Sequence, residues 1–488
     1  MQKRFFSSLA LSLLLNLLIK PVSVLVIDAG VQRIIGNEAY GQYFILLSLT
    51  LVFNIFLDLG INNYTTRVIA QEESALNNHV SKVFYLRVLL CLLYLFLVLI
   101  AGWLINIDKS QYDLLLFLII NQCLIQTIAF IRSLFSGLHR FKTDTVISVM
   151  DRALLIVLMG TAFIFYQEHI TVYSFVFAQL VSYSLTAVLA IWLIRKHLNF
   201  KAFSFDPGYI RGVLIKSFPF ALLVLLMLIY NRSDVVILKQ LSTNGNYQAG
   251  IYAQGYRLLD AFYMLGMIFA GLLFPVFSRM LHQQNKELNN LIQIVGKLLI
   301  GGVLGLLFVT YFNGAFLLKV IYGKQVNENS VLVFNWLMVA FLAMSFNFIF
   351  GTLLTAGGFM KELNIIAFIG VICTVFANGC LIPSFGALGC AMAAVATQTV
   401  VSVLLVVLAK KRLGAGLNIR AALSILGFFI ALLFCKWGLS FMTSLFNSSV
   451  IIDVLFVLVF AVIFSIIDIK SLKKIWQLND TVVEINEP

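Results

Sequence analysis

Apolar stretches of about 20 residues recur from one end of this chain to the other, and an α-helix needs roughly that length to cross the hydrocarbon core of a membrane. Hydrophobic residues make up 61% of the 488-residue sequence and charged residues only 11%. Almost no soluble mass can therefore lie between the apolar stretches. The sequence predicts an all-α, polytopic membrane protein.

The apolar pattern divides into about fourteen predicted transmembrane helices joined by short connections, of which 63–82 and 195–211 are the longest. Lys3 and Arg4 precede the first apolar run as in a signal peptide, but Lys20 and Pro21 follow it in place of a small-residue cleavage site. We therefore predict an uncleaved first helix, which Pro21 breaks after Lys20. The spans are predicted at about 5–28, 40–62, 83–105, 111–131, 145–166, 171–194, 212–241, 251–277, 291–317, 330–356, 363–383, 386–409, 419–440 and 449–468.

The distribution of lysine and arginine predicts the orientation of these spans, because cytoplasmic loops of membrane proteins are enriched in both. If both termini are cytoplasmic, inside segments hold 22 of the 34 basic residues. The net charge of +13 then reflects membrane topology and does not indicate nucleic-acid binding. The six basic residues of the predicted outside segments are Arg33, Lys109, Lys239, Lys319, Lys324 and Lys436.

Two short sequence echoes indicate an internal duplication. Tyr40-Gly41-Gln42-Tyr43 opens the second predicted helix, and Gly250-Ile251-Tyr252 opens the eighth. Six helices per repeat would relate the halves by a pseudo-two-fold axis along the membrane normal, with a cavity between two six-helix bundles. We predict an N-terminal bundle at 1–209, a second bundle at 210–412, a helix pair at 413–469 and a cytoplasmic tail at 470–488.

The sequence lacks the motifs of several enzyme classes. It contains no G-x-x-x-x-G-K-[ST] loop for ATP and no H-E-x-x-H zinc motif. The five histidines are scattered, and the six cysteines lie in apolar segments without a C-x-x-C pair. We therefore predict no enzymatic activity, no metal site and no cofactor.

Charged and amide residues nevertheless occur within the predicted spans, where a charge costs about 2.5–3.5 kcal/mol on insertion scales. Arg232 and Asp234 interrupt the seventh helix after about 14 apolar residues. Such residues usually face a bundle interior or a cavity and mark a substrate or ion path. The other reading is that Arg87, Arg152 and Lys297 are interfacial anchors, and that Asn16, Asn54 and Asn347 form hydrogen bonds between helices.

Several motifs together resemble the polysaccharide (O-antigen) flippases of the multidrug/oligosaccharidyl-lipid/polysaccharide exporter superfamily. The eighth helix carries Gly250-Ile251-Tyr252-x-x-x-Tyr256-Arg257-Leu258 and continues to Pro275-x-x-Ser278-Arg279. The resemblance extends over residues 5–410. It also includes the segments Asn16-Leu17-Leu18-Ile19-Lys20-Pro21, Tyr40-Gly41-Gln42-Tyr43, Leu57-Asp58-Leu59-Gly60 and Pro383-x-x-Gly386-x-x-Gly389-Cys390-Ala391.

This resemblance implies two six-helix bundles with alternating access in a bacterial cytoplasmic (inner) membrane. The implied cargo is an undecaprenyl-pyrophosphate-linked oligosaccharide, moved from the cytoplasmic to the periplasmic leaflet. The implied partners are membrane lipid, a polysaccharide polymerase and glycosyltransferases. Arginine suits the pyrophosphate because it can bind oxyanions in a bidentate manner. The predicted substrate-binding residues are Lys20, Arg232, Arg257, Asn16 and Arg152.

Lone carboxylates do not suit an anionic cargo. Asp58, Asp234 and Asp260 are therefore predicted to compensate an arginine or to couple transport to a proton or Na⁺ gradient. Three alternatives stay open at this point. They are an ion-coupled multidrug exporter of the same fold, a lipid II flippase, and a membrane glycosyl or acyl transferase with dispersed site residues.

Overall fold

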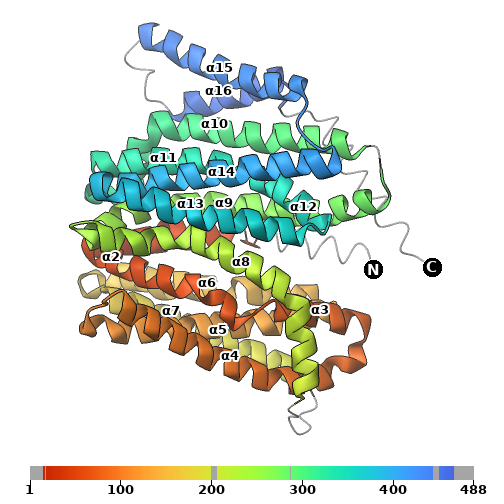
Figure 1. The fold of residues 1–488 in the computed structure, drawn as a ribbon. Coiled ribbons are helices and arrows are strands. Elements are labelled where there is room, and N and C mark those ends of the chain that lie inside the picture. Colours follow the sequence, from red (N-terminus) through yellow and green to blue (C-terminus); the bar gives the residue numbers. More distant parts are fainter. Residues whose placement is uncertain (1–14, 17, 199–205, 286, 443–449, 467–488) are drawn as a thin grey trace. The chain divides into compact units, whose positions relative to one another are not determined.

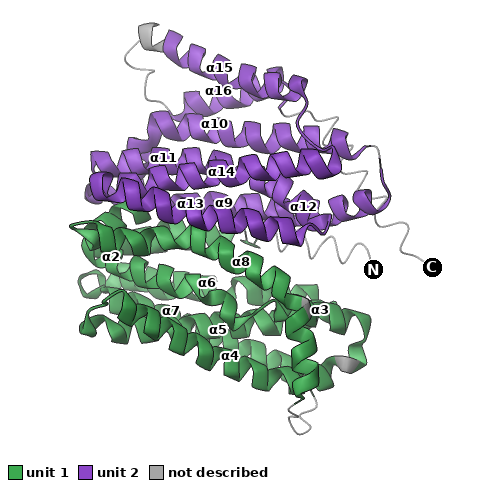
Figure 2. Cartoon of the chain, in the orientation of Figure 1, with its two compact units in different colours: residues 1–253 green, residues 254–488 purple. Residues whose placement is uncertain are grey.

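The computed structural model describes residues 15–16, 18–198, 206–285, 287–442 and 450–466, and every regular element in these ranges is helical (Figure 1). The predicted tail at 470–488 and the start of the first span lie outside the described residues. The chain forms two compact units, unit 1 at Met1–Ala253 and unit 2 at Gln254–Pro488 (Figure 2). The all-α prediction is confirmed. The boundary between the two units lies inside one helix. The predicted division of the two sequence repeats at 209/210 stays a prediction.

Unit 1 begins with a helix that is described from Leu18 onward. It contains η1 (Ser23–Asp28), α2 (Ala29–Val52), η2 (Asn54–Leu57), α3 (Ile61–Gln71), η3 (Glu73–Ala75), α4 (Leu76–Leu104), η4 (Lys109–Gln111), α5 (Tyr112–Gly137), α6 (Phe141–Phe165), η5 (Gln167–His169), α7 (Val172–Arg195), α8 (Pro207–Leu241) and the start of α9 (Gly245–His282). Helix α5 packs against α3, α6 and α7, and α8 packs against α2.

Unit 2 contains the rest of α9 and the C-terminal helices. These are α10 (Leu288–Tyr322), η6 (Gly323–Gln325), α11 (Glu328–Phe346), η7 (Asn347–Gly351), α12 (Thr352–Ala356), α13 (Met360–Phe385), α14 (Ala387–Leu413), α15 (Ile419–Met442) and α16 (Val450–Ile463). Helix α14 packs against α11 and α13, and α10 packs against α11, α15 and α16.

Eleven helices of the described chain are long and apolar enough to cross a membrane. A further pair, Leu18–Val52 and Asn54–Gln71, passes the same test together but is bent by 51°. The shorter apolar helix Val450–Ile463 is the last. The eleven helices lie where the third to thirteenth spans are predicted, and Val450–Ile463 lies within the fourteenth. They confirm a polytopic membrane protein.

The first two spans differ from prediction in how they connect. We expected a connection over 29–39, but helix continues to both sides of Gly36, which alone is non-helical at φ 88° and ψ 170°. Glycine adopts positive φ without a Cβ clash, so one residue is enough to break the helix.

The prediction that Pro21 breaks the first helix is wrong. The helix continues through Pro21 and passes into the π-helix Ser23–Asp28. Proline removes one backbone donor and crowds the preceding turn, and π-helical turns are a recurrent way for a helix to continue past such local strain. Lys20 therefore lies inside a continuous helix.

The second predicted span also ends differently. It gives way to η2, and Gly60 then adopts the left-handed conformation at φ 81°. Part of the predicted hydrophilic interruption at 63–82 is helix α3, which buries Ile61, Thr65 and Ile69. Asp58 therefore lies at a break between helices, where its carboxylate accepts a hydrogen bond from the Asn62 backbone at 3.0 Å.

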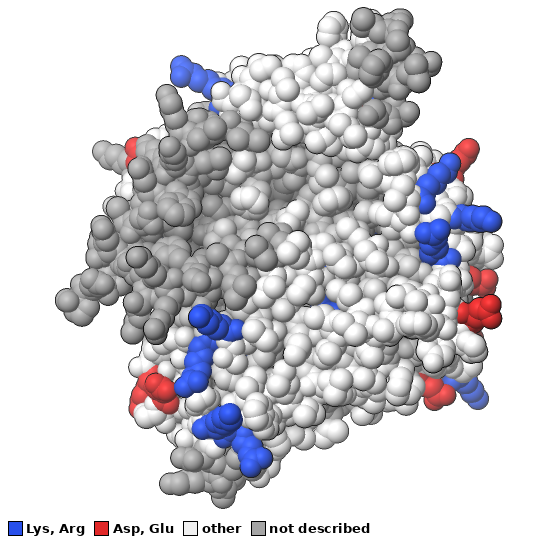
Figure 3. All heavy atoms as spheres, turned by 180° about the vertical axis from the view of Figure 1, so that it is seen from behind, with Lys and Arg blue, Asp and Glu red and all other residues white. Residues whose placement is uncertain are grey.

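Large apolar side chains cover the outer faces of both units. Trp103, Phe376 and Ile451 are 70–73% exposed, which suits contact with lipid. Figure 3 shows one face of the molecule, on which charged side chains lie toward the helix ends and an almost uncharged band separates them. This distribution is that expected for helices crossing a bilayer.

Lys436, which was predicted to lie in an outside segment, lies within helix α15. Its ammonium lies in α15, is 5% exposed, and pairs with the fully buried carboxylate of Asp453 in α16. Asn313 of α10 donates to the same carboxylate at 2.7 Å. The C-terminal helices are thereby joined to α10 by a buried polar contact.

Candidate functional site

Unit 1 brings together several of the predicted site residues. Lys20, on the first helix, lies within electrostatic range of Arg132 in α5 and of Asp144, Asp151 and Arg152 in α6. Three helices therefore contribute charges to one cluster. Two predicted substrate-binding residues, Lys20 and Arg152, belong to it.

Arg152 is the member of this cluster placed deepest along its helix. It lies close to the middle of α6, which spans Phe141–Phe165. The interfacial-anchor reading of Arg152 therefore loses support, because an anchor would lie near a helix end. An arginine at this depth is tolerated only where it is paired or meets water.

The nearest ion-pair partner of Arg152 leaves its guanidinium donors largely unused. Nε lies 3.6 Å from an Asp151 carboxylate oxygen, and the side chain is 30% exposed. Charge-assisted hydrogen bonds are shorter, near 2.7–2.9 Å. The guanidinium also lies 6.0 Å from the centre of the Tyr183 ring of α7. Arg152 therefore retains donors that can bind an oxyanion.

A second pair in the cluster is tighter. Arg132 donates from Nε to Asp144 at 2.6 Å, and its side chain is 34% exposed. Asn16 donates to the Ser148 hydroxyl at 3.3 Å, which joins the first helix to α6. Asp28 of η1 adds a further carboxylate near Arg152. The cluster thus holds as many carboxylates as basic side chains, and its arginines remain partly accessible.

Arg132 and Asp144 are site residues that the sequence reasoning missed. The predicted helices ended at 131 and began at 145, which left both residues in a loop. The structure extends α5 to Gly137 and starts α6 at Phe141. The charged residues that directly flank the two apolar runs could have indicated that both helices extend further, because helices commonly continue beyond the hydrocarbon core.

Asp58 belongs to a different polar network of unit 1. Arg87 of α4 pairs with the Asp58 carboxylate at 3.3 Å and also bonds the Asn62 side chain. Arg87 donates to the Gln126 carbonyl at 3.1 Å and lies 4.1 Å from the Phe130 ring centre. Asp58 therefore compensates an arginine, which is one of its two predicted roles.

The same network confirms that Asn54 forms hydrogen bonds between helices. Its amide donates to Gln122 at 2.7 Å and accepts from Gln126 at 2.5 Å, both on α5. Arg87 is 12% exposed, so the guanidinium is an internal structural group and not an interfacial anchor.

The helix that carries Arg232 and Asp234 is continuous from Pro207 to Leu241. Arg232 is half-buried, whereas Asp234 is only 3% exposed. The Tyr252 hydroxyl donates to the Asp234 carboxylate at 3.4 Å. Asp234 is thus a buried carboxylate with at least one polar neighbour inside unit 1.

Unit 2 contains the predicted pair Arg257 and Asp260. Their charged groups approach to 3.9 Å one helical turn apart on α9, with side chains 10% and 13% exposed. Because Lys20 and Arg232 belong to unit 1 and Arg257 to unit 2, a cavity that all three share stays a prediction. Within the described residues, no cluster of three or more His, Cys, Asp or Glu side chains could hold a metal ion.

Comparison with known families gives one match, to the family described as "Polysaccharide biosynthesis protein", over residues 6–281. No curated protein matches the sequence. The match covers more than half of the chain, and it includes the cluster around Lys20 and Arg152.

Several solved structures share the fold. A lipid II flippase, MurJ, in an inward closed conformation has a TM-score of 0.71 at 16% identity, covering 95% of this chain and 99% of that one. An inward-facing multidrug resistance MATE family transporter of the MOP superfamily has a TM-score of 0.63 at 15% identity, covering 83% and 97%. An outward-facing one has a TM-score of 0.53 at 16% identity, covering 82% and 98%. At these identities the likeness is one of fold, and the fold is that of membrane transporters and flippases.

Proposed function

Because this chain belongs to the polysaccharide biosynthesis protein family and has the fold of MOP transporters, we propose that it is a flippase for an undecaprenyl-pyrophosphate-linked oligosaccharide. It moves the sugar from the cytoplasmic to the periplasmic leaflet of a bacterial inner membrane by alternating access. Both termini are cytoplasmic in this proposal. Chemistry at the sugar is left to glycosyltransferases and a polymerase.

The observation that carries the proposal is the position of Arg152. Its guanidinium lies midway along a membrane helix, keeps 30% of its side-chain surface accessible and has no described ion-pair partner nearer than 3.6 Å. If the charged Arg152 side chain faced lipid at this depth, insertion of the helix would cost about 2.5–3.5 kcal/mol more. A pyrophosphate offers the oxygen pairs that a planar guanidinium binds best. Lys20 and Arg132, in the same cluster, supply further positive charge.

The remaining predicted residues have roles in this proposal. Arg232 and Arg257 contact the pyrophosphate or the first sugars, and Asn16 contributes an amide to the path. Asp234 and Asp260 compensate these cations, or couple transport to a proton or Na⁺ gradient. Amide and charged side chains can hydrogen-bond the hydroxyl groups of a glycan, while the prenyl tail can stay in lipid.

The test uses the source bacterium with the gene deleted and then complemented. Deletion should remove surface polysaccharide and leave its lipid-linked precursor in the inner leaflet. Arg152→Ala should fail to restore export at normal protein level, and Arg152→Lys should restore it in part because the charge survives. The matched control is Arg195→Ala, which changes an exposed arginine at the end of α7.

Three results would contradict the proposal. Normal polysaccharide in the Arg152→Ala strain would remove the observation that supports it. Loss of resistance to cationic drugs on deletion, with polysaccharide intact, would favour a multidrug exporter. Proteoliposomes that move lipid II but not the lipid-linked oligosaccharide would favour the lipid II flippase.

A further inference from the structure

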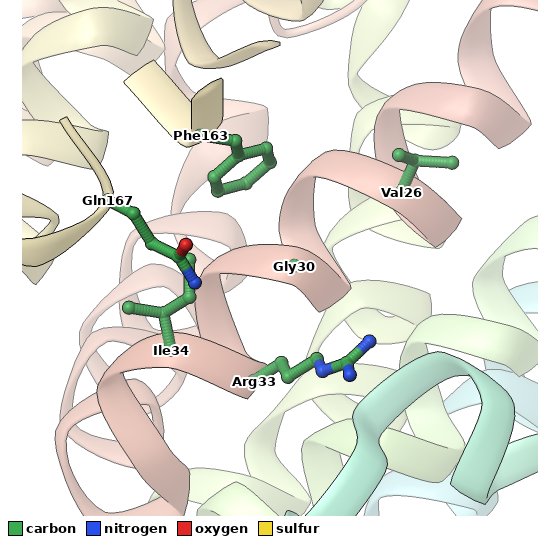
Figure 4. Close-up of a pocket in the computed structure, with 6 residues that line it drawn as sticks. All are labelled: Val26, Gly30, Arg33, Ile34, Phe163 and Gln167. Atoms are coloured by element: carbon green, nitrogen blue, oxygen red, sulfur yellow. The ribbon is translucent and has the colours of Figure 1, made fainter. Parts of the chain in front are cut away.

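Unit 1 contains a cavity that none of these roles uses. Its volume is about 620 Å³, and it is lined by Val26, Gly30, Arg33, Ile34, Phe163 and Gln167 (Figure 4). This volume lies within the range of roughly 300–1,000 Å³ that small-molecule sites occupy. Arg33 is one of the six basic residues predicted to lie outside.

The cavity is formed between one helix face, the end of α6 and the start of η5. Residues 26, 30, 33 and 34 recur at spacings of three and four, which places them on one side of their helix. A Cβ atom on Gly30 would lie 2.9 Å from the tip of the Phe163 ring. The absence of a side chain at Gly30 therefore lets the ring lie close against the helix.

Arg33 is exposed, and no ion pair or hydrogen bond joins it to another residue of the described chain. In Figure 4 the Arg33 side chain extends away from Gln167, and the Phe163 ring lies on the other side of Gly30 from Arg33. By contrast, Lys82 and Arg132 of the same unit both pair with carboxylates. The guanidinium of Arg33 is thus available to an anion.

We propose that this cavity binds an acidic saccharide. Arg33 binds a carboxylate or phosphate oxygen pair, Phe163 packs against the apolar face of a sugar ring, and the Gln167 amide bonds ring hydroxyls. The proposal rests on the proposed function, since the predicted orientation places Arg33 at the periplasmic end. There it would receive the glycan after transport, apart from the cluster around Arg152.

The experiment measures binding to the purified full chain in nonionic detergent by isothermal titration. Three probes are used: a tetrasaccharide of alternating glucuronate and N-acetylglucosamine, a neutral glucose tetrasaccharide of equal length, and inorganic pyrophosphate. The acidic tetrasaccharide should bind saturably and more tightly than the neutral one. Binding of pyrophosphate alone would overturn the saccharide assignment and favour a phosphate or lipid headgroup.

Variants localise the binding. Arg33→Ala should weaken binding of the acidic tetrasaccharide about tenfold, as expected for loss of one charge-assisted hydrogen bond, and Arg33→Lys should restore part of it. Gln167→Ala should weaken both tetrasaccharides. The control is Lys109→Ala, an exposed basic residue on another connection of unit 1. Unchanged affinity in Arg33→Ala, or an equal loss in Lys109→Ala, would overturn the proposal.

This test is separable from that of the proposed function. If the gene deletion leaves polysaccharide export intact, the flippase role fails whatever Arg33 does. If export depends on the gene but Arg33→Ala binds the acidic tetrasaccharide normally, the flippase role stands and the cavity assignment fails.

Discussion

Gly41 and Gly250 lie against each other where α2 crosses the start of α9. A Cβ atom on Gly41 would lie 1.8 Å from the Asn246 carbonyl oxygen and 2.7 Å from the Gly250 nitrogen. One on Gly250 would lie 1.9 Å from the Asn37 carbonyl oxygen. The Gln32 amide bridges the crossing, because it donates to the Gly250 carbonyl at 2.8 Å and to Asn37 at 3.0 Å. The two Gly-x-Tyr echoes of the sequence therefore meet in space.

This crossing predicts that neither glycine tolerates a side chain. Gly41→Ala and Gly250→Ala each place a methyl group against backbone, so we expect a loss of at least about 1–3 kcal/mol in unfolding free energy. Thermal stability of the detergent-solubilised protein, followed by size-exclusion chromatography, measures this. Gly160→Ala in α6 is the control, since nothing lies within 4 Å of its added Cβ. Equal stability of all three variants would show that the crossing is looser than described.

A second prediction concerns Arg87 and Asp58. Removing one partner of a buried ion pair costs about 3–5 kcal/mol, so Arg87→Ala should reduce protein level and thermal stability strongly. Arg87→Lys should recover little, because a lysine cannot bond Asp58, Asn62 and the Gln126 carbonyl together. Arg67→Ala, at an exposed position on α3, should have no effect. A stable Arg87→Ala protein that fails in export would instead indicate a transport role.

The Lys436–Asp453 pair allows a double-mutant test. Either single substitution, Lys436→Met or Asp453→Leu, leaves a buried charge unpaired and should destabilise unit 2 by about 3–5 kcal/mol. The double variant should be much less destabilised, because two apolar side chains can replace a buried pair at little cost. Thermal unfolding of the four proteins gives the coupling energy. Additive losses would mean that the two groups do not interact in the membrane.

The ion pair at the start of α8 predicts that the stability of this helix end depends on pH. Lys82 donates to Asp206 at 2.8 Å, and this hydrogen bond holds the pKa of the Asp206 carboxyl below its usual value. A carboxyl whose pKa is lower in the folded protein than in the unfolded chain, where it is about 3.9, stabilises the folded state at higher pH. That contribution is lost as the pH falls through the pKa of the folded state. Amide protection in the first turn of α8, corrected for the intrinsic pH dependence of exchange, should therefore fall below about pH 4. Asp206→Asn should show fast exchange already at neutral pH; protection equal to wild type there would refute the contact.

The sequence by itself determined the class of the protein and the place of nearly every helix. Crossing a bilayer requires a minimum apolar length, so each span from α4 to α15 left a long, mostly apolar run in the sequence. The breaks at Gly36 and Asp58–Gly60 were harder to place, because one glycine with positive φ replaces a whole polar connection.

Only the tertiary structure decided which polar side chains meet. Asp58 meets Arg87 and Lys436 meets Asp453 from separate helices, and Lys20 lies within electrostatic range of Arg152. Membrane helices are apolar on nearly all sides, so their periodicity does not reveal which face turns toward a neighbour. Rotation and crossing are decided by packing, as at Gly41 and Gly250. The sequence could therefore name the charged residues of the site, and the fold alone determined their partners.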